Sequence, residues 1–247
     1  MPKRLIGFST GTFFEFSDPL AKESINFVKN LGCETIEVNW HRIKSQPPSK
    51  NLSKIIDRYF QHVSLHLPVD MSDGGGIFKT IDILNRTYEI FIRCKSFGYA
   101  VIHPNMIAGW DKFYQMFNHN FSLPLAIENM DDRKKSFRDL HSLLEFFKKY
   151  PAIGLVFDVN HWITNGNSIA SIANTIETFL SNGVKLVGIH LSGTGFHEPL
   201  FKTPGAKEIV KSLQYLSPNV PIIIESIFEN PNEPAIELAF IREYLEV

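Results

Sequence analysis

Acidic and histidine side chains recur within or at the ends of short apolar segments along this chain, and their types suit metal-binding or acid–base chemistry. Such a residue is found in seven successive segments: Glu37, His66, His103, Glu128, Asp158, His190 and Glu225. Carboxylate and imidazole groups are common ligands of divalent cations. They are also the groups that most often transfer protons in enzymes. The pattern predicts a metal-binding or acid–base site where these segments meet.

The alternation of side chains along a strand indicates which of them share a face. In Val63–Leu67 the apolar residues alternate with Ser64 and His66, so we expect these two to point away from the covering helices. By the same alternation, we expect five further pairs of residues to point inward: Glu37 and Asn39, Ala126 and Glu128, Val156 and Asp158, Gly188 and His190, and Ile223 and Glu225. A single inward histidine is usually a hydrogen-bonded core residue. Four converging carboxylates, however, repel one another in a poorly solvated site unless a cation compensates them. We therefore expect one divalent metal ion, with two or three as the alternative, drawn from Zn, Mn, Mg, Co and Fe.

These side chains need a scaffold that brings successive segments together. The β-rich segments are Leu5–Thr10, Thr35–Trp40, Val63–Leu67, Tyr99–His103, Leu123–Asn129, Ile153–Asp158, Lys185–Leu191 and Pro221–Ser226. Helical patterns lie between them, over Pro19–Leu31, Leu52–Tyr59, Phe78–Phe97, Trp110–Phe117, Phe137–Tyr150, Ser168–Leu180, Ala206–Leu216 and Glu233–Leu245. Eight strand–helix units in 247 residues predict a single α/β domain over residues 1–247, a parallel eight-stranded (β/α)8 TIM barrel. The loops Lys44–Lys54 and Met71–Gly76 follow strands two and three, so we expect them beside the active site.

Composition excludes several classes of protein. The chain has 25 basic and 26 acidic residues and a formal charge of -1, which argues against a protein whose main task is to bind nucleic acid. Cys33 and Cys94 are expected to be buried thiols without a disulfide. No apolar run approaches the roughly 20 residues of a membrane span, so we expect a cytoplasmic protein that makes no membrane contact.

The ordered set of segments resembles the xylose-isomerase-like barrel superfamily, which includes sugar isomerases, epimerases and the endonuclease IV family. The matching segments are Thr-Ile-Glu37-Val, His66-Leu-Pro68, Ile-His103-Pro104, Ala-Ile-Glu128-Asn129-Met, Phe-Asp158-Val-Asn-His161, Gly-Ile-His190-Leu and Ile-Ile-Glu225-Ser. The resemblance implies a principal metal held by Glu128, Asp158, His190 and Glu225. In the isomerase and epimerase branch it also implies that Glu128 and Glu225 exchange a proton with the sugar, that His161 contacts a substrate oxygen, and that Glu37 is a further polar contact.

In the endonuclease branch the same positions resemble part of a three-metal cluster. His66, His103 and a bridging Glu128 would hold a second ion. His161 would help to hold a third ion, with an aspartate and a histidine from an Asp-x-His motif after strand seven. Here that segment reads Gly195-Phe196-His197, so the histidine is present and the aspartate is a glycine. This departure weakens the third site.

Three functions remain open. The first is a metal-dependent sugar or sugar-phosphate isomerase or epimerase that works through an enediolate, with His66, Glu37 and Trp162 as expected substrate contacts and a small carbohydrate as its partner. The second is metal-dependent hydrolysis of phosphodiesters at abasic sites in DNA, the one case in which nucleic acid would be a partner. The third is a metal-binding accessory or oxidative protein. The outer helices of such barrels often associate, so a homo-oligomer is also an expectation.

Overall fold

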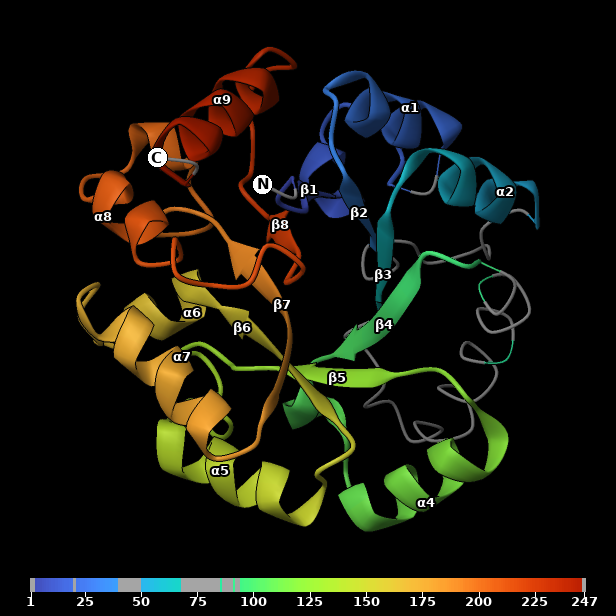
Figure 1. The fold of residues 1–247 in the computed structure, drawn as a ribbon, viewed down its shortest axis with the longest axis vertical. Helices are drawn as coiled ribbons and strands as arrows, with labels where there is room; N and C mark the ends of the chain where they lie inside the picture. The colour runs from blue at the N-terminus through green and yellow to red at the C-terminus, as the bar shows by residue number, and fades with distance from the viewer. Residues whose placement is uncertain are drawn as a thin grey trace.

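The strands form a closed parallel barrel in chain order, from β1 to β8, in this computed structural model. The structure describes residues 3–19, 21–39, 50–67, 85, 91 and 94–245, without the side chains of 50–53 and 120. The strands are β1 (Ile6–Ser9), β2 (Thr35–Asn39), β3 (His62–His66), β4 (Phe97–Ile102), β5 (Leu125–Glu128), β6 (Gly154–Asp158), β7 (Lys185–Leu191) and β8 (Ile222–Ile224). They surround a central axis, and the helices lie outside them (Figure 1). The predicted eight-stranded (β/α)8 barrel is confirmed.

Helices follow the strands and cover their outer faces. The α-helices are α1 (Lys22–Asn30), α2 (Lys50–Tyr59), α4 (Trp110–Asn120), α5 (Leu140–Lys149), α6 (Val159–Thr164), α7 (Ser171–Ser181), α8 (Ala206–Lys211) and α9 (Glu233–Leu245). Short 3-10 helices follow β1, β4 and β7: η1 (Thr10–Phe13), η2 (Pro104–Met106) and η3 (Leu200–Lys202). None of the helices in the described ranges is both long and apolar enough to cross a bilayer.

Some predicted boundaries need correction. The helix predicted over Leu52–Tyr59 begins at Lys50, so it includes the last residues of the loop predicted over Lys44–Lys54, and the short helix α6 was not expected. The predicted helix Phe78–Phe97 falls mostly outside the described residues, but its last residue, Phe97, begins β4. The strand continues through Gly98, where a Cβ atom would lie only 2.0 Å from the His62 ring, so the absent side chain lets β3 and β4 approach. Residues 40–49 and 68–76, which include Trp40, Pro68 and the loop Met71–Gly76, also lie outside the described residues.

Two layers of apolar side chains confirm the alternation along the strands. Ile127 and Phe157 belong to the large core between the barrel and its helices. Val101, Ala126 and Val156 instead form a separate cluster inside the barrel. Side chains two residues further along β5 and β6 face the same interior. The strand ends therefore direct their polar groups to one point on the axis.

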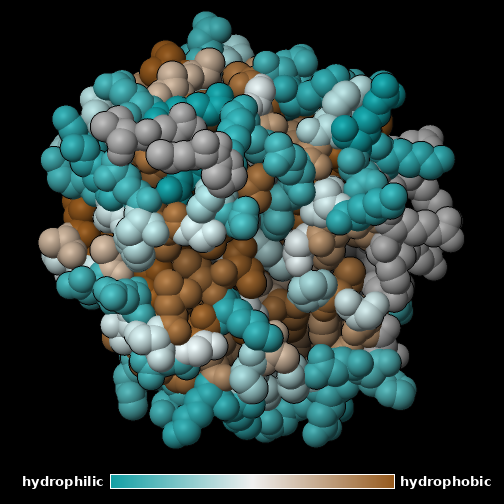
Figure 2. Space-filling model, in the orientation of Figure 1, coloured by the Kyte–Doolittle hydropathy of each residue, from teal (hydrophilic) through white to brown (hydrophobic). Residues whose placement is uncertain are grey.

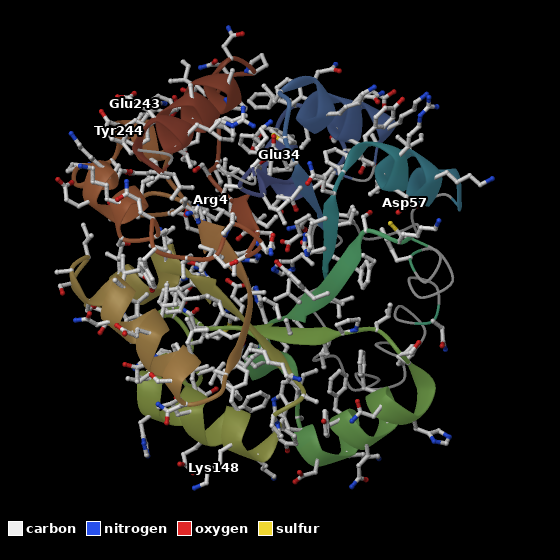
Figure 3. All side chains as sticks on the ribbon, viewed as in Figure 1. Arg4, Glu34, Asp57, Lys148, Glu243 and Tyr244 are labelled. Atoms are coloured by element: carbon white, nitrogen blue, oxygen red, sulfur yellow. The ribbon has the colours of Figure 1, made fainter. Side chains whose placement is uncertain are left out.

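A polar side chain joins the residues before β1 to the segment before β8. Arg4 donates to the carbonyl oxygens of Leu216 (2.9 Å) and Gln214 (2.8 Å), which ties the start of the chain to the segment before β8. In Figure 3, Arg4 lies on the inner side of α8 and Glu34 lies between α9 and α1, whereas Lys148 lies at the edge of the molecule on α5. On the face shown in Figure 2, hydrophobic side chains gather near the middle and hydrophilic side chains surround them.

Candidate metal centre and active site

Four ligand-type side chains meet at the carboxyl end of the barrel. Glu128 ends β5, Asp158 ends β6, His190 lies on β7, and Glu225 follows β8 directly. Asp158 and His190 are paired across β6 and β7, and the Glu225 N–H continues the ladder by donating to Leu191 O at 2.9 Å. One potential ligand atom from each of the four lies within 4.8 Å of the others. The structure thus brings together the set that the resemblance implied, while its role as a metal site stays a prediction.

The spacing within this group suits ligands around a small cation. His190 Nδ1 lies 3.3 Å from Glu225 Oε2 and 3.5 Å from Glu128 Oε2. Ligand atoms about 2.0–2.2 Å from one ion in tetrahedral geometry are about 3.3–3.5 Å apart. Neither carboxylate oxygen of Glu128 has a partner in hydrogen-bond geometry among the described residues, although His161 Nδ1 lies 2.9 Å from Glu128 Oε1. His190 Nδ1 is also buried without a partner in hydrogen-bond geometry. Buried charged groups need compensation, so these side chains fit a divalent cation.

A second group shares Glu128 with the first. His66 Nε2 lies 3.5 Å from Glu128 Oε2 and His103 Nε2 lies 3.4 Å from the same oxygen. These three residues also offer ligand atoms within 4.8 Å of one another. The ring of His66 is oriented by the contact of its Nδ1 with Leu67 O at 3.0 Å, which turns Nε2 toward Glu128. The arrangement has the shape of a second metal position with Glu128 between the two.

Asn129 and the start of α6 hold Asp158 in place. The Asn129 side chain accepts from Asp158 N (2.7 Å) and donates to Asp158 O (2.9 Å), so it completes the backbone pairing at the end of β6. Asp158 is also the N-cap of α6, because its Oδ1 accepts from His161 N at 2.7 Å. The other oxygen, Oδ2, lies 3.7 Å from His161 Nδ1. Asn129 was part of the matching motif, but sequence reasoning assigned it no role.

His161 and His197 lie beside the principal group. His161 Nδ1 donates to Asn129 O at 2.8 Å, and its Nε2 is 3.7 Å from Asp131 Oδ2. The rings of His161 and His197 are 5.8 Å apart. The backbone φ is positive at both Gly195 (75°) and His197 (51°). The carbonyl oxygen of His197 accepts a hydrogen bond from Ile227 N at 2.7 Å. A non-glycine residue held in the left-handed region is often found at functional sites. The loop after β7 thus presents His197 although the expected aspartate is Gly195.

A cavity of about 270 Å³ opens above these groups. It is lined by Ser9, Gly11, Thr12, Asn39, His66, His103, Glu128, Met130, Asp131, Arg133, Lys134, His161, Phe196, His197, Glu225 and Ile227. Asp131 is buried and pairs with Arg133, whose guanidinium lies over the exposed Phe196 ring. Sequence reasoning missed this wall, because the charges of residues 131–135 have mixed signs and no periodic pattern. The cavity is concave and has several convergent polar groups, as small-molecule sites have.

Two expected substrate contacts lie elsewhere. Glu37 is fully buried and is absent from the described lining of the cavity, which Asn39 reaches instead. The inward face was correct, but Glu37 lies two residues before the end of β2 and therefore one layer deeper. Trp162 packs on Phe157 and donates from Nε1 to Ser171 Oγ at 3.1 Å, so α6 turns it toward α7 and into a separate cavity. His66, the third expected contact, does line the cavity.

The titration of the cluster is governed by its burial and its opposite charges. Burial disfavours the charged form of Glu128, but His190 and His161 outweigh it and hold the Glu128 pKa well below its usual range. Burial raises the pKa of Asp158 to about 6 despite the charge of His161. Burial also disfavours protonated His66 and His161, yet the carboxylates raise the pKa of His66 to about 9 and that of His161 to about 10. Without a metal ion, these two histidines are therefore protonated at neutral pH.

Comparison with known proteins separates sequence similarity from structural similarity. No protein-family model matches the chain, and no curated protein matches its sequence significantly. Solved structures are similar throughout: 3-keto-D-glucoside 4-epimerase from E. coli has a TM-score of 0.70 at 12% identity, covering 98% of this chain and 100% of its own. An L-ribulose 3-epimerase has a TM-score of 0.71 at 15% identity, covering 99% of this chain and 95% of its own. A xylose isomerase domain containing protein from Salmonella typhimurium has a TM-score of 0.70 at 13% identity, covering 100% of this chain and 99% of its own. The chain has the xylose-isomerase-like barrel fold.

Proposed function

We propose that this protein is a divalent-metal-dependent isomerase or epimerase of a small carbohydrate. The observation that carries the proposal is that Glu128 and Glu225 belong to one potential metal group and also line the cavity above it. A substrate in the cavity would therefore lie against both carboxylates. Two named epimerases among the similar structures support a carbohydrate substrate. A small-molecule partner and a cytoplasmic location belong to the same proposal.

In this proposal, the described side chains carry out proton transfer at a carbon beside a carbonyl group. Glu128, Asp158, His190 and Glu225 would hold the ion, which supplies a positive charge that polarises the substrate oxygens. One of the two glutamates takes the proton from the carbon, and the other returns a proton to the resulting enediolate. His161 would contact a substrate oxygen. This role is supported by the contact of its Nδ1 with Asn129 O and by the position of its Nε2, which lies 3.7 Å from Asp131 Oδ2 at the cavity wall.

A second candidate function has its own observation. The group of His66, His103 and Glu128 resembles a second metal position, and two ions that share a carboxylate suit phosphodiester hydrolysis. Hydrolysis at abasic sites in DNA is therefore the alternative. The glycine at position 195 counts against the full three-metal arrangement, since it leaves His161 and His197 without the motif's aspartate.

Metal stoichiometry and two assays separate these functions. The purified protein is loaded with Zn²⁺ or Mn²⁺, the bound ions are counted by elemental analysis, and their positions are found by anomalous scattering. Isomerase chemistry predicts that deuterium from the solvent is incorporated into ketose and aldose substrates. The Glu225→Gln variant should lose this incorporation together with most of the bound metal. Lys148→Ala, at the outer edge of α5, serves as the control and should keep both. Metal-dependent nicking of an abasic-site duplex that disappears in Glu128→Gln, with two or more ions bound, would overturn the leading function in favour of hydrolysis.

A further inference from the structure

Glu37 lies at the deep side of the candidate metal centre and contacts His190. With His66, His190 and Glu225 it also forms a further group of possible ligands, whose ligand atoms lie within 4.8 Å of one another. Its Oε2 is 3.2 Å from His190 Nε2 and accepts a hydrogen bond from Ser64 Oγ at 2.9 Å. Both Glu37 and His190 are fully buried. Their strands, β2 and β7, are not neighbours, because β1 and β8 lie between them in the barrel. The contact therefore spans the interior of the barrel and does not merely extend a strand pair.

The ring of His190 is oriented in the opposite way to the rings of His66 and His161. The rings of His66 and His161 contact backbone carbonyl oxygens through Nδ1. His190 instead contacts the Glu37 carboxylate through Nε2 and turns Nδ1 toward Glu128 and Glu225. A carboxylate accepts only, so Nε2 must carry the proton. Nδ1 is then the nitrogen with a lone pair for an ion in neutral His190.

The environment of Glu37 points to a positive neighbour on the His190 side. Glu37 Oε1 is buried without a hydrogen-bond partner among the described residues. A buried carboxylate that accepts bonds through one oxygen alone is costly unless a positive charge lies close by. His190 supplies that charge, either with a second proton or with an ion on Nδ1. The ion, His190, Glu37 and Ser64 then form one hydrogen-bonded series.

We propose that Glu37 is a positioning residue of the metal centre, which fixes His190 in the tautomer with the proton on Nε2 and makes Nδ1 its ligand atom. This inference rests on the proposed metal-dependent function, because it assigns a second layer to the same site. Partners of this kind orient the ligand and increase its basicity, and their loss typically weakens metal binding about 10- to 100-fold. Glu37 does not need to touch the substrate to act in this way.

Zinc affinity measured without any activity assay tests the role of Glu37. Zn²⁺ binding is measured by competition with a chromophoric chelator in wild type, Glu37→Ala and Glu37→Gln. Glu37→Ala should bind Zn²⁺ about 10- to 100-fold more weakly. Glu37→Gln keeps an acceptor oxygen of the same reach without the charge, so its loss should be smaller. Lys148→Ala changes an exposed residue at the outer edge of α5, so it is the control, and its affinity should stay within about threefold of wild type.

The tautomer of His190 gives an independent measurement. Long-range proton–nitrogen correlation spectra of protein labelled with ¹⁵N-histidine report which ring nitrogen carries the proton, and His190→Gln identifies the signal. Zinc-loaded wild type should show the proton on Nε2 of His190, and Glu37→Gln should keep it there. If Glu37→Ala does not fold, the comparison of Glu37→Gln with Lys148→Ala still decides the matter.

The outcomes distinguish this inference from the proposed function. If wild type binds Zn²⁺ and both Glu37 variants bind it within twofold of wild type, the positioning role is refuted and the metal centre stands. The role is also refuted if zinc-loaded wild type has the His190 proton on Nδ1. If wild type binds neither Zn²⁺ nor Mn²⁺, both proposals fail together. Weaker binding in the Glu37 variants than in Lys148→Ala supports the role.

Discussion

Replacing Asn129 with alanine should destabilise the barrel and the candidate metal centre together. The Asn129 side chain is fully buried between β5 and β6. It accepts from Asp158 N at 2.7 Å and donates to Asp158 O at 2.9 Å. Alanine removes both interactions and leaves a buried N–H and a buried C=O of Asp158 without these partners. The carbonyl of Asn129, which accepts from His161 Nδ1, is retained.

The expected loss of stability follows from these two groups. A buried polar group left without a partner costs about 1–3 kcal/mol, so Asn129→Ala should lower the free energy of unfolding by about 2–6 kcal/mol. This is a large share of the roughly 5–15 kcal/mol that stabilises an ordinary domain. The exposed Asn219 provides a matched control. Asn219→Ala should change the stability by less than about 0.5 kcal/mol.

Urea denaturation followed by circular dichroism, with and without Zn²⁺, measures both effects. An ion at 100 times its dissociation constant stabilises the protein that binds it by about 2.7 kcal/mol. At the same Zn²⁺ concentration, the increment should be smaller in Asn129→Ala than in wild type, because Asp158 is less well held. A stability loss below about 0.5 kcal/mol, or an unchanged zinc increment, would refute the view that Asn129 supports the site through Asp158.

Three further predictions concern loops and charge. Glu237 is buried in α9, where it accepts hydrogen bonds from the backbone N–H groups of Leu200 and Phe201 and from the hydroxyl of Ser226. Glu237→Leu should therefore lower the free energy of unfolding, measured by urea denaturation, by about 2–4 kcal/mol. Gly195 has a φ of 75°, so Gly195→Ala should lower the free energy of unfolding by about 1–2 kcal/mol in the same assay. An unchanged free energy of unfolding would contradict the left-handed backbone at this position. The raised pKa values of His66 (about 9) and His161 (about 10) stabilise the metal-free protein fully below their unfolded values near 6.5. That contribution is lost as pH rises through 9 and 10, so the metal-free protein should unfold at lower urea at pH 10 than at pH 7. Zinc affinity should rise over the same range because the ion displaces these protons; an affinity independent of pH would contradict the protonated state.

Strand periodicity was sufficient to predict the faces of the ligand-type residues but not their depth. Glu128, Asp158 and His190 meet because each stands at the end of a strand whose alternating pattern is clear. Glu37 shows the limit, since the inward face includes both Glu37 and Asn39 and the height of each depends on how the strands are staggered. The structure places Asn39 at the cavity and Glu37 beneath it. A pattern of period two contains no information about that stagger.

Residues outside the strands were harder to predict for a related reason. Trp162 follows β6 closely, but the Asp158 cap starts α6 at once and turns the indole toward Ser171. Asp131 stands in a loop of mixed charges, and only its burial beside His161 shows that it belongs to the cavity wall. Loop conformation depends on such tertiary contacts. The barrel was therefore predictable from repetition, and the cavity walls were not.

The charge of the cluster explains why its geometry already suits an ion. In the metal-free protein, the raised pKa values of His66 and His161 mean that protons on these rings offset the carboxylates. His190 has a pKa well above its usual range for the same reason, although burial opposes its protonation. A divalent ion that binds Nδ1 of His190 would therefore replace positive charge that is already present, and would add little to the total. If an ion binds here as proposed, its affinity should depend on competition with protons as much as on attraction to the carboxylates.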